Sequence, residues 1–279
     1  MFDEQKLQRL PRHTIWDHVI ELLPNAPKSL PGQLLPLMQE EIMEVHKFVD
    51  EHLKRRTIQE SWSPYAANFF FVKKKDGKLR PVQDYRPLNK WTIKNRNVSP
   101  LIPATIDCLS GCTLFTKFDV RWGYNNIRMK PGDEWKAAFL TLERLFEPRV
   151  MFFGLINSPA TFQMMMNTIF CKEVAEGWLS VYMDDITIHS KKCPLETEEQ
   201  HCQWYKLYVH HVLDKLKKHD LYLKPEKCAF EKDKIDYLGV IIGNGIVKMD
   251  PSKLKGVADW PKPKMPTEIR QFLRFTGYY

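Results

Sequence analysis

Two adjacent carboxylates, Asp184 and Asp185, interrupt a short run of β-branched and aromatic residues between Val181 and Ile188. That composition predicts two strands joined by a tight turn, with the acids at its tip. Aspartate is a common turn residue, so an ordinary hairpin explains the pair as readily as a magnesium site for phosphoryl transfer does. Residues elsewhere in the chain must decide between these interpretations.

A third carboxylate, Asp119, is predicted near the end of a separate strand over residues 114–120. Two carboxylates on a hairpin and one on another strand form a donor set that can hold two divalent ions about 3.5–4 Å apart. Mg²⁺ prefers one or two carboxylates plus substrate phosphates to a full protein cage. The set therefore predicts Mg²⁺ as the cofactor, with Mn²⁺ as a second candidate, and nucleotidyl transfer as the chemistry.

A lysine-rich segment lies between two extended runs, residues 69–72 and 79–82, and contains Asp76-Gly77, a strong hairpin signal. Lys74 and Arg80 belong either to a solvated turn or to a hairpin that grips a polyphosphate through charge-assisted hydrogen bonds. The whole chain has 42 Lys and Arg against 34 Asp and Glu, a formal net charge of +8. That balance suits a phosphate-backbone partner, but it is also an ordinary aid to solubility.

The elements that must position these residues are mixed helices and hairpins. Three helices are predicted over 38–55, 204–219 and 267–276, and a loop over 191–203 precedes the second of them. Another helix is predicted to begin at Asn157-Ser158-Pro159, with Ser158 at the N-cap and Pro159 at the first helical position. The further predicted strands are 136–141, 147–153, 235–242 and 246–249. This order lacks a βαβ rhythm and favours an α+β fold over a doubly wound sheet. No common nucleotide-binding glycine loop occurs, and no apolar run is long enough to span a membrane.

A series of motifs then resembles, in order, the reverse transcriptase of gypsy-type (Metaviridae) LTR retrotransposon polyproteins, most closely the fungal members. The motifs are Ser63-Pro64-Tyr65-Ala66, Phe71 to Pro81, Gln83 to Asn89, Phe118-Asp119-Val120-Arg121-Trp122-Gly123-Tyr124, Phe153 to Gln163, Tyr182-Met183-Asp184-Asp185, Leu223 to Cys228 and Tyr237-Leu238-Gly239. One such motif would be a weak signal, whereas the whole series in this order is specific.

The resemblance implies a right-hand polymerase of α+β class, with fingers, palm and a partial thumb, and a palm whose antiparallel sheet carries helices on one face. It implies an N-terminal extension with an amphipathic helix over 1–60, fingers over 61–93 and 127–157, palm over 94–126 and 158–244, and the start of a truncated thumb over 245–279.

The resemblance also implies roles for individual residues. The metal ions would be held by Asp119, the Val120 carbonyl, Asp184 and Asp185, with Asp185 contributing least. The nucleotide would be bound by Lys74, Arg80, Tyr124 and Gly154. Template and primer would contact Asn157, Ser158, Pro159, Tyr182 and Met183, and a primer grip formed by Tyr237, Leu238 and Gly239. Tyr124 would be the aromatic side chain that excludes a ribose 2′-hydroxyl, since one added oxygen would clash with its ring. Lys224 and Lys227 are alternative proton donors to pyrophosphate.

The implied partners are an RNA template, a DNA primer, the RNA–DNA duplex and dNTPs, with no membrane, in an intracellular setting such as a cytoplasmic particle or the nucleus. The oligomeric state stays open. Two alternatives also stay open: a catalytically inactive, truncated retroelement remnant that at most binds nucleic acid, and a polymerase of another template class. The three acids favour activity, and Tyr124 favours a DNA-making enzyme. Arg144 departs from the family, which often has glycine there.

Overall fold

The structure is a computed structural model that describes residues 9–73, 77–96, 100–192, 197–243, 245–249 and 251–277. Lys74 and the rest of the predicted hairpin tip over 74–76 lie outside the described residues. No helix within the described ranges is long and apolar enough to cross a membrane.

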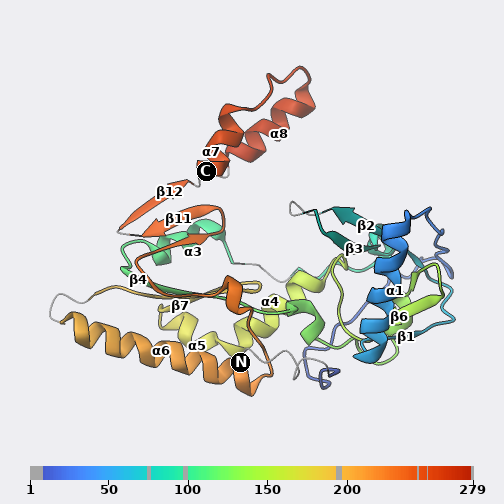
Figure 1. Cartoon of the computed structure of the whole chain (residues 1–279), viewed down its shortest axis with the longest axis horizontal. Coiled ribbons are helices and arrows are strands. Elements are labelled where there is room, and N and C mark those ends of the chain that lie inside the picture. The colour runs from blue at the N-terminus through green and yellow to red at the C-terminus, as the bar shows by residue number, and fades with distance from the viewer. Residues whose placement is uncertain are drawn as a thin grey trace.

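A four-stranded antiparallel sheet forms the centre of the molecule. Its strand order is β7 (Leu179–Tyr182), β8 (Asp185–Ser190), β4 (Leu114–Asp119) and β9 (Ala229–Lys232). The helices α4 (Ser158–Ile169), α5 (Cys171–Ala175) and α6 (Glu198–Lys218) lie along one face of this sheet (Figure 1). Helix α6 buries Tyr205, Val209 and Val212, whose spacing of three and four residues puts them on the side that faces the core.

A second, five-stranded sheet lies beyond α4 and has the order β1 (Ile58–Glu60), β6 (Leu145–Pro148), β5 (Phe139–Leu140), β2 (Ala67–Lys73) and β3 (Leu79–Asp84). Helix α1 (Gln39–Lys54) packs here through the fully buried Val45 and Val49 (Figure 1). Helix α2 (Arg86–Trp91) follows β3. The N-terminal segment runs extended and pairs with later segments through isolated bridges such as His18 with Met129 and Leu22 with Thr92.

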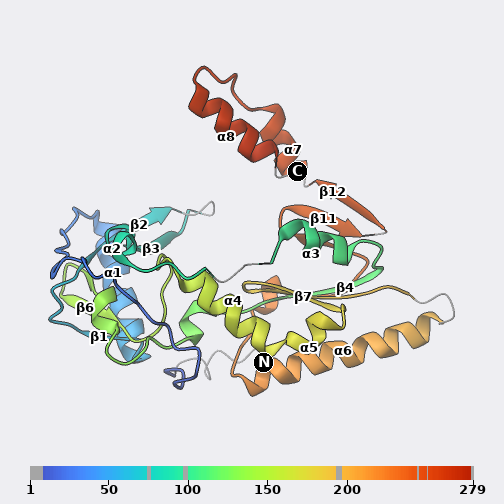
Figure 2. The ribbon, with the colours of Figure 1, turned by 180° about the vertical axis from the view of Figure 1, so that it is seen from behind.

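A third sheet, β10 (Lys234–Tyr237), β11 (Val240–Gly243) and β12 (Ile246–Met249), packs with α3 (Ile102–Leu109) over the other side of β4. Leu109, Phe115 and Ile235 form its shared core. Helices α7 (Pro251–Ala258) and α8 (Pro266–Thr276) project from this end of the molecule, as both views show (Figures 1 and 2). Trp260 joins them by packing against Phe272 and Phe275.

The α+β class with antiparallel sheets is confirmed, and helices α1 and α8 lie where the apolar spacing predicted them. The 191–203 loop was predicted too long, since α6 already begins at Glu198. The reason is a capping box in which the Thr197 hydroxyl accepts from the Gln200 N–H and the Gln200 side chain accepts from the Thr197 N–H.

Other boundaries differ for equally local reasons. The predicted strand 235–242 is two strands, because Leu238 and Gly239 form a turn with φ of +48° and +87°. The predicted strand 147–153 ends at Pro148. The N-cap of α4 is Asn157 rather than Ser158, since the buried Ser158 hydroxyl donates to the Phe152 carbonyl. Helix α7 and strand β9 were not predicted.

Candidate active site

Pairing between β4 and β8 brings the three predicted acids together. Asp119 is the last residue of β4 and lies directly opposite Asp185, the first residue of β8. Asp184 occupies the turn between β7 and β8, and its carbonyl oxygen accepts from the Val120 N–H at 3.1 Å. The antiparallel register therefore sets an acid from one strand against an acid pair from a distant hairpin.

The acid-bearing turn is strained and externally supported. Met183 has φ of +55°, a left-handed conformation that a long side chain rarely adopts. Gln163, only 2% exposed on α4, accepts from the Met183 N–H at 2.7 Å and donates from Nε2 to the Val181 carbonyl at 3.2 Å. One buried amide thus holds both sides of the turn. No role was predicted for Gln163, although an amide at a core position of an apolar helix is a usable signal.

Lysine side chains form ion pairs with Asp119 and Asp185. Lys224 Nζ donates to Asp119 Oδ1 at 2.9 Å, and Lys227 Nζ donates to Asp119 Oδ2 at 3.2 Å. Lys117 Nζ lies 3.2 Å from Asp185 Oδ1. Burial raises the pKa of Asp185, and the Asp184 carboxylate raises it further, while Lys117 opposes the shift.

The carboxylate oxygens of these acids suit a hard divalent cation, which would displace the lysine ammonium groups from them. Within the described ranges, no three Asp, Glu, His or Cys side chains are already arranged to hold a metal ion. Carboxylate oxygens on neighbouring strands are nevertheless the ligands that Mg²⁺ prefers, and substrate phosphates commonly complete such a site. Asp119 and Asp185 therefore provide a partial site whose oxygens are at present paired with ammonium groups.

Tyr124 lies next to the acids on a short 3₁₀ helix, Gly123–Asn126. Its ring centre is 4.6 Å from that of Phe153 and 5.6 Å from that of Phe162, so two aromatic neighbours fix its position. Burial, reinforced by the nearby Asp184 carboxylate, raises the pKa of Tyr124 to about 12. Gly123 provides room, because a Cβ there would lie 3.2 Å from the Phe162 ring and 3.6 Å from Asp184 Cβ.

The turn before α4 is tied to the five-stranded sheet and α2. Gly154 has φ of +96°, and its carbonyl accepts from Asn89 Nδ2 at 2.8 Å. Asn157, 8% exposed, donates from Nδ2 to the Ile93 carbonyl at 2.8 Å. Ser158 and Pro159 begin α4 behind this turn. The predicted nucleotide and template residues Gly154, Asn157, Ser158 and Pro159 therefore lie together at one hydrogen-bonded turn. Arg80 lies elsewhere and is exposed on β3.

The predicted primer-grip residues form the β10–β11 turn. Tyr237 is fully buried and pairs with Val240 across Leu238 and Gly239. Tyr182, by contrast, pairs with Asp185 at the end of β7. Arg144, the departure from the family, lies in a turn and forms an ion pair with Glu60 on the neighbouring strand. A large cation is therefore accommodated at that position.

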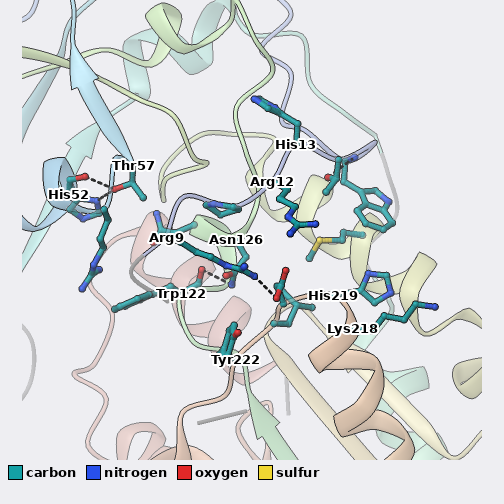
Figure 3. A pocket seen from close by; sticks show the side chains of 18 residues that line it. Arg9, Arg12, His13, His52, Thr57, Trp122, Asn126, Lys218, His219 and Tyr222 are labelled. Atoms are coloured by element: carbon teal, nitrogen blue, oxygen red, sulfur yellow. Dashed lines mark hydrogen bonds and ion pairs between the residues drawn. The ribbon is translucent and has the colours of Figure 1, made fainter. Parts of the chain in front are cut away.

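A cavity of about 280 Å³ lies beside the segment after β4, and none of the three acids lines it (Figure 3). Cations from separate segments, among them Arg9, Arg12 and Lys218, line it with Trp122, whose ring lies under the Arg55 guanidinium at 4.0 Å. This cavity was not predicted, because no local sequence pattern joins its lining residues.

Comparisons with known proteins show which family this chain resembles. A family model described as reverse transcriptase (RNA-dependent DNA polymerase) matches residues 72–242. The Tf2-3 and Tf2-4 transposon polyproteins of Schizosaccharomyces pombe are each 36% identical over 249 residues, 89% of this chain. The chain spans only 18% of the length of these polyproteins.

Two solved structures share the fold. The foamy viral protease-reverse transcriptase in complex with RNA/DNA hybrid matches 97% of this chain and 35% of its own, with a TM-score of 0.78 and 18% identity. The dRH form of that protein in complex with double-stranded DNA matches 98% of this chain and 46% of its own, with a TM-score of 0.79 and 18% identity. The predicted right-hand polymerase fold is thereby confirmed.

Proposed function

This chain belongs to the reverse transcriptase family, and we propose that it is the RNA-directed DNA polymerase domain of a gypsy-type LTR retrotransposon polyprotein. The observation that carries the proposal is the register that sets Asp119 opposite Asp185, with Asp184 in the adjoining turn. The similarity to fungal transposon polyproteins supports the element type. Its proposed substrates are dNTPs, an RNA template and a DNA primer.

The chain's own residues define what each part of the site would do. Asp119, Asp184 and Asp185 would hold two divalent ions, which when bound would activate the primer hydroxyl and neutralise the leaving pyrophosphate. Tyr124, fixed between Phe153 and Phe162, would close the nucleotide pocket against a 2′-hydroxyl. Lys224 or Lys227 would donate a proton or positive charge to pyrophosphate, and their hydrogen bonds to Asp119 support this role.

Primer extension on an RNA template tests the proposal. We expect incorporation of dNTPs with Mg²⁺ or Mn²⁺, and loss of extension by at least about a hundredfold in Asp184→Ala, because a metal ligand is removed. Asp214→Ala is the matched control, since Asp214 is an exposed carboxylate on α6. Unchanged extension by Asp184→Ala would refute the metal assignment.

The alternative of an inactive remnant predicts a different result. Such a chain would fold and bind nucleic acid, with an affinity that falls steeply as salt rises, but would not extend a primer with either ion.

The division of the chain into fingers, palm and thumb at the predicted boundaries is part of our proposal, as is a location in a cytoplasmic particle or the nucleus.

A further inference from the structure

One lysine of the central sheet, Lys117, contacts both the acid pair and the hairpin that carries Tyr237. Its Nζ lies 3.2 Å from Asp185 Oδ1 and donates to the Asp236 carbonyl oxygen at 3.3 Å. The same ammonium group lies 5.9 Å from the centre of the Tyr237 ring. A protonated lysine has three donor hydrogens and no acceptor, so a single side chain can serve both oxygens.

The sheet geometry explains why Lys117 reaches Asp185. Lys117 and Asp119 are two residues apart on β4, so their side chains leave the sheet on the same face. The register sets Asp119 opposite Asp185 and Lys117 opposite Thr187, which makes Lys117 and Asp185 diagonal neighbours. A long side chain spans that diagonal distance, and a short one would not.

Lys117 differs from the two lysines that hold Asp119. Lys224 and Lys227 occupy both oxygens of one carboxylate and must yield them to a metal ion. Lys117 holds one oxygen of Asp185, and its other bonded partner is a backbone carbonyl. The Lys117 side chain is 21% exposed and that of Asp185 is 25% exposed, so this pair is better sheltered than an ordinary surface ion pair.

The contact with Asp236 matters because this residue lies beside the proposed primer grip. Asp236 and Tyr237 end β10 and lead directly into the Leu238-Gly239 turn. Beneath it, apolar packing among residues such as Phe115 and Ile235 holds this hairpin to β4. Apolar packing has no preferred direction, whereas a charge-assisted hydrogen bond requires its two partners to stay within a short distance.

We propose that Lys117 is a positioning residue that fixes the β10–β11 hairpin against the Asp185 carboxylate. A primer end presented by that hairpin then keeps a set distance from the acids that hold the metal ions. This inference rests on the proposed function, since primer placement has meaning only for a polymerase.

The first test measures chemistry and binding separately. Lys117→Met keeps an unbranched apolar chain of similar length but removes the charge and the donors. We expect the single-turnover extension rate at saturating primer–template to fall about tenfold, while the Kd for the duplex stays within about twofold. Lys234→Met is the matched control, because Lys234 is exposed on the same hairpin. Extension by Lys117→Met at the wild-type rate would overturn the proposal.

A second test does not depend on activity. Amide hydrogen exchange over residues 235–242 should quicken about fivefold in Lys117→Met and remain unchanged in Lys234→Met, with residues 186–190 of β8 as an internal reference. If the wild-type chain extends no primer, the proposed function fails, but the exchange result still decides whether Lys117 holds the hairpin. Unchanged exchange over 235–242 would overturn the tether.

Lys117→Gln covers the case in which Lys117→Met does not fold. Its amide keeps donors for the Asp236 carbonyl but has no charge for Asp185. We expect the rate of amide hydrogen exchange over residues 235–242 in Lys117→Gln to lie between the rates in wild type and Lys117→Met. We also expect its primer-extension rate to be reduced. A folded Lys117→Gln that matches wild type in both measurements would overturn the role of the charged pair.

Discussion

Lys224→Met should tighten divalent metal binding and slow catalysis at the same time. Lys224 Nζ lies 2.9 Å from Asp119 Oδ1, an oxygen that would also be a metal ligand. Two unit charges at that separation attract by roughly 6 kcal/mol at an effective dielectric constant of about 20. The Lys224 side chain is 24% exposed, and the entropy and desolvation of such pairs reduce the net contribution to about 1 kcal/mol.

Removing that competitor should therefore lower the Kd for Mn²⁺ about fivefold. Lys227→Met should show a smaller change, about twofold, because the Lys227 side chain is 58% exposed and its Nζ lies 3.2 Å from Asp119 Oδ2. Extension should slow in Lys224→Met if that lysine also supplies the proton to pyrophosphate.

Electron paramagnetic resonance counts free Mn²⁺ during a titration without nucleotide or nucleic acid, at fixed ionic strength. Lys248→Met controls for the lost positive charge, since Lys248 is exposed on β12. A Kd for Mn²⁺ in Lys224→Met equal to that of Lys248→Met, or weaker than wild type, would refute competition between Lys224 and the metal for Asp119.

Three further predictions concern other parts of the fold. Tyr124→Ala should relax sugar selection, because it opens the wall that Phe153 and Phe162 support; the ratio of dNTP to rNTP incorporation measures this, and an unchanged ratio would count against the gate. Gly154→Ala should lower the free energy of unfolding, measured in urea, by about 2–3 kcal/mol, since φ is +96° and the new Cβ would lie 3.3 Å from the Gln83 carbonyl oxygen. Gly132→Ala is the control: its φ is +89° but the space around it is open, so it should cost only about 1 kcal/mol. Equal costs for the two variants would show that crowding at Gly154 has no effect. Burial lowers the pKa of His189 to about 4, so the unfolded chain binds a proton at a higher pH than the folded chain does. The free energy of unfolding should therefore fall as the pH falls from about 6.5 to 4. His189→Asn should flatten this dependence on pH in urea unfolding, and an identical dependence would exclude His189 as its source.

The sequence predicted the local elements around the proposed site well because such elements depend on residue types in short, local patterns. Asp184 and Asp185 between β-branched residues predicted a hairpin, and the structure has one with Asp184 in the turn. The apolar spacing of residues 38–55 likewise predicted α1, since a helix buries one face by local periodicity. Capping and turn contacts set the boundaries, so α6 began earlier and residues 235–242 divided into two strands.

Only the tertiary structure decided which distant side chains meet. Antiparallel register placed Asp119 opposite Asp185, and an isolated bridge between Val120 and Leu223 brought Lys224 to Asp119. The contacts of Lys117 and Gln163 could not be read from the sequence, because their partners are a diagonal strand neighbour and a turn packed on a helix. Side-chain types are written along the chain, but distances between strands and helices arise when the core packs, and these distances determine which charge neutralises which acid.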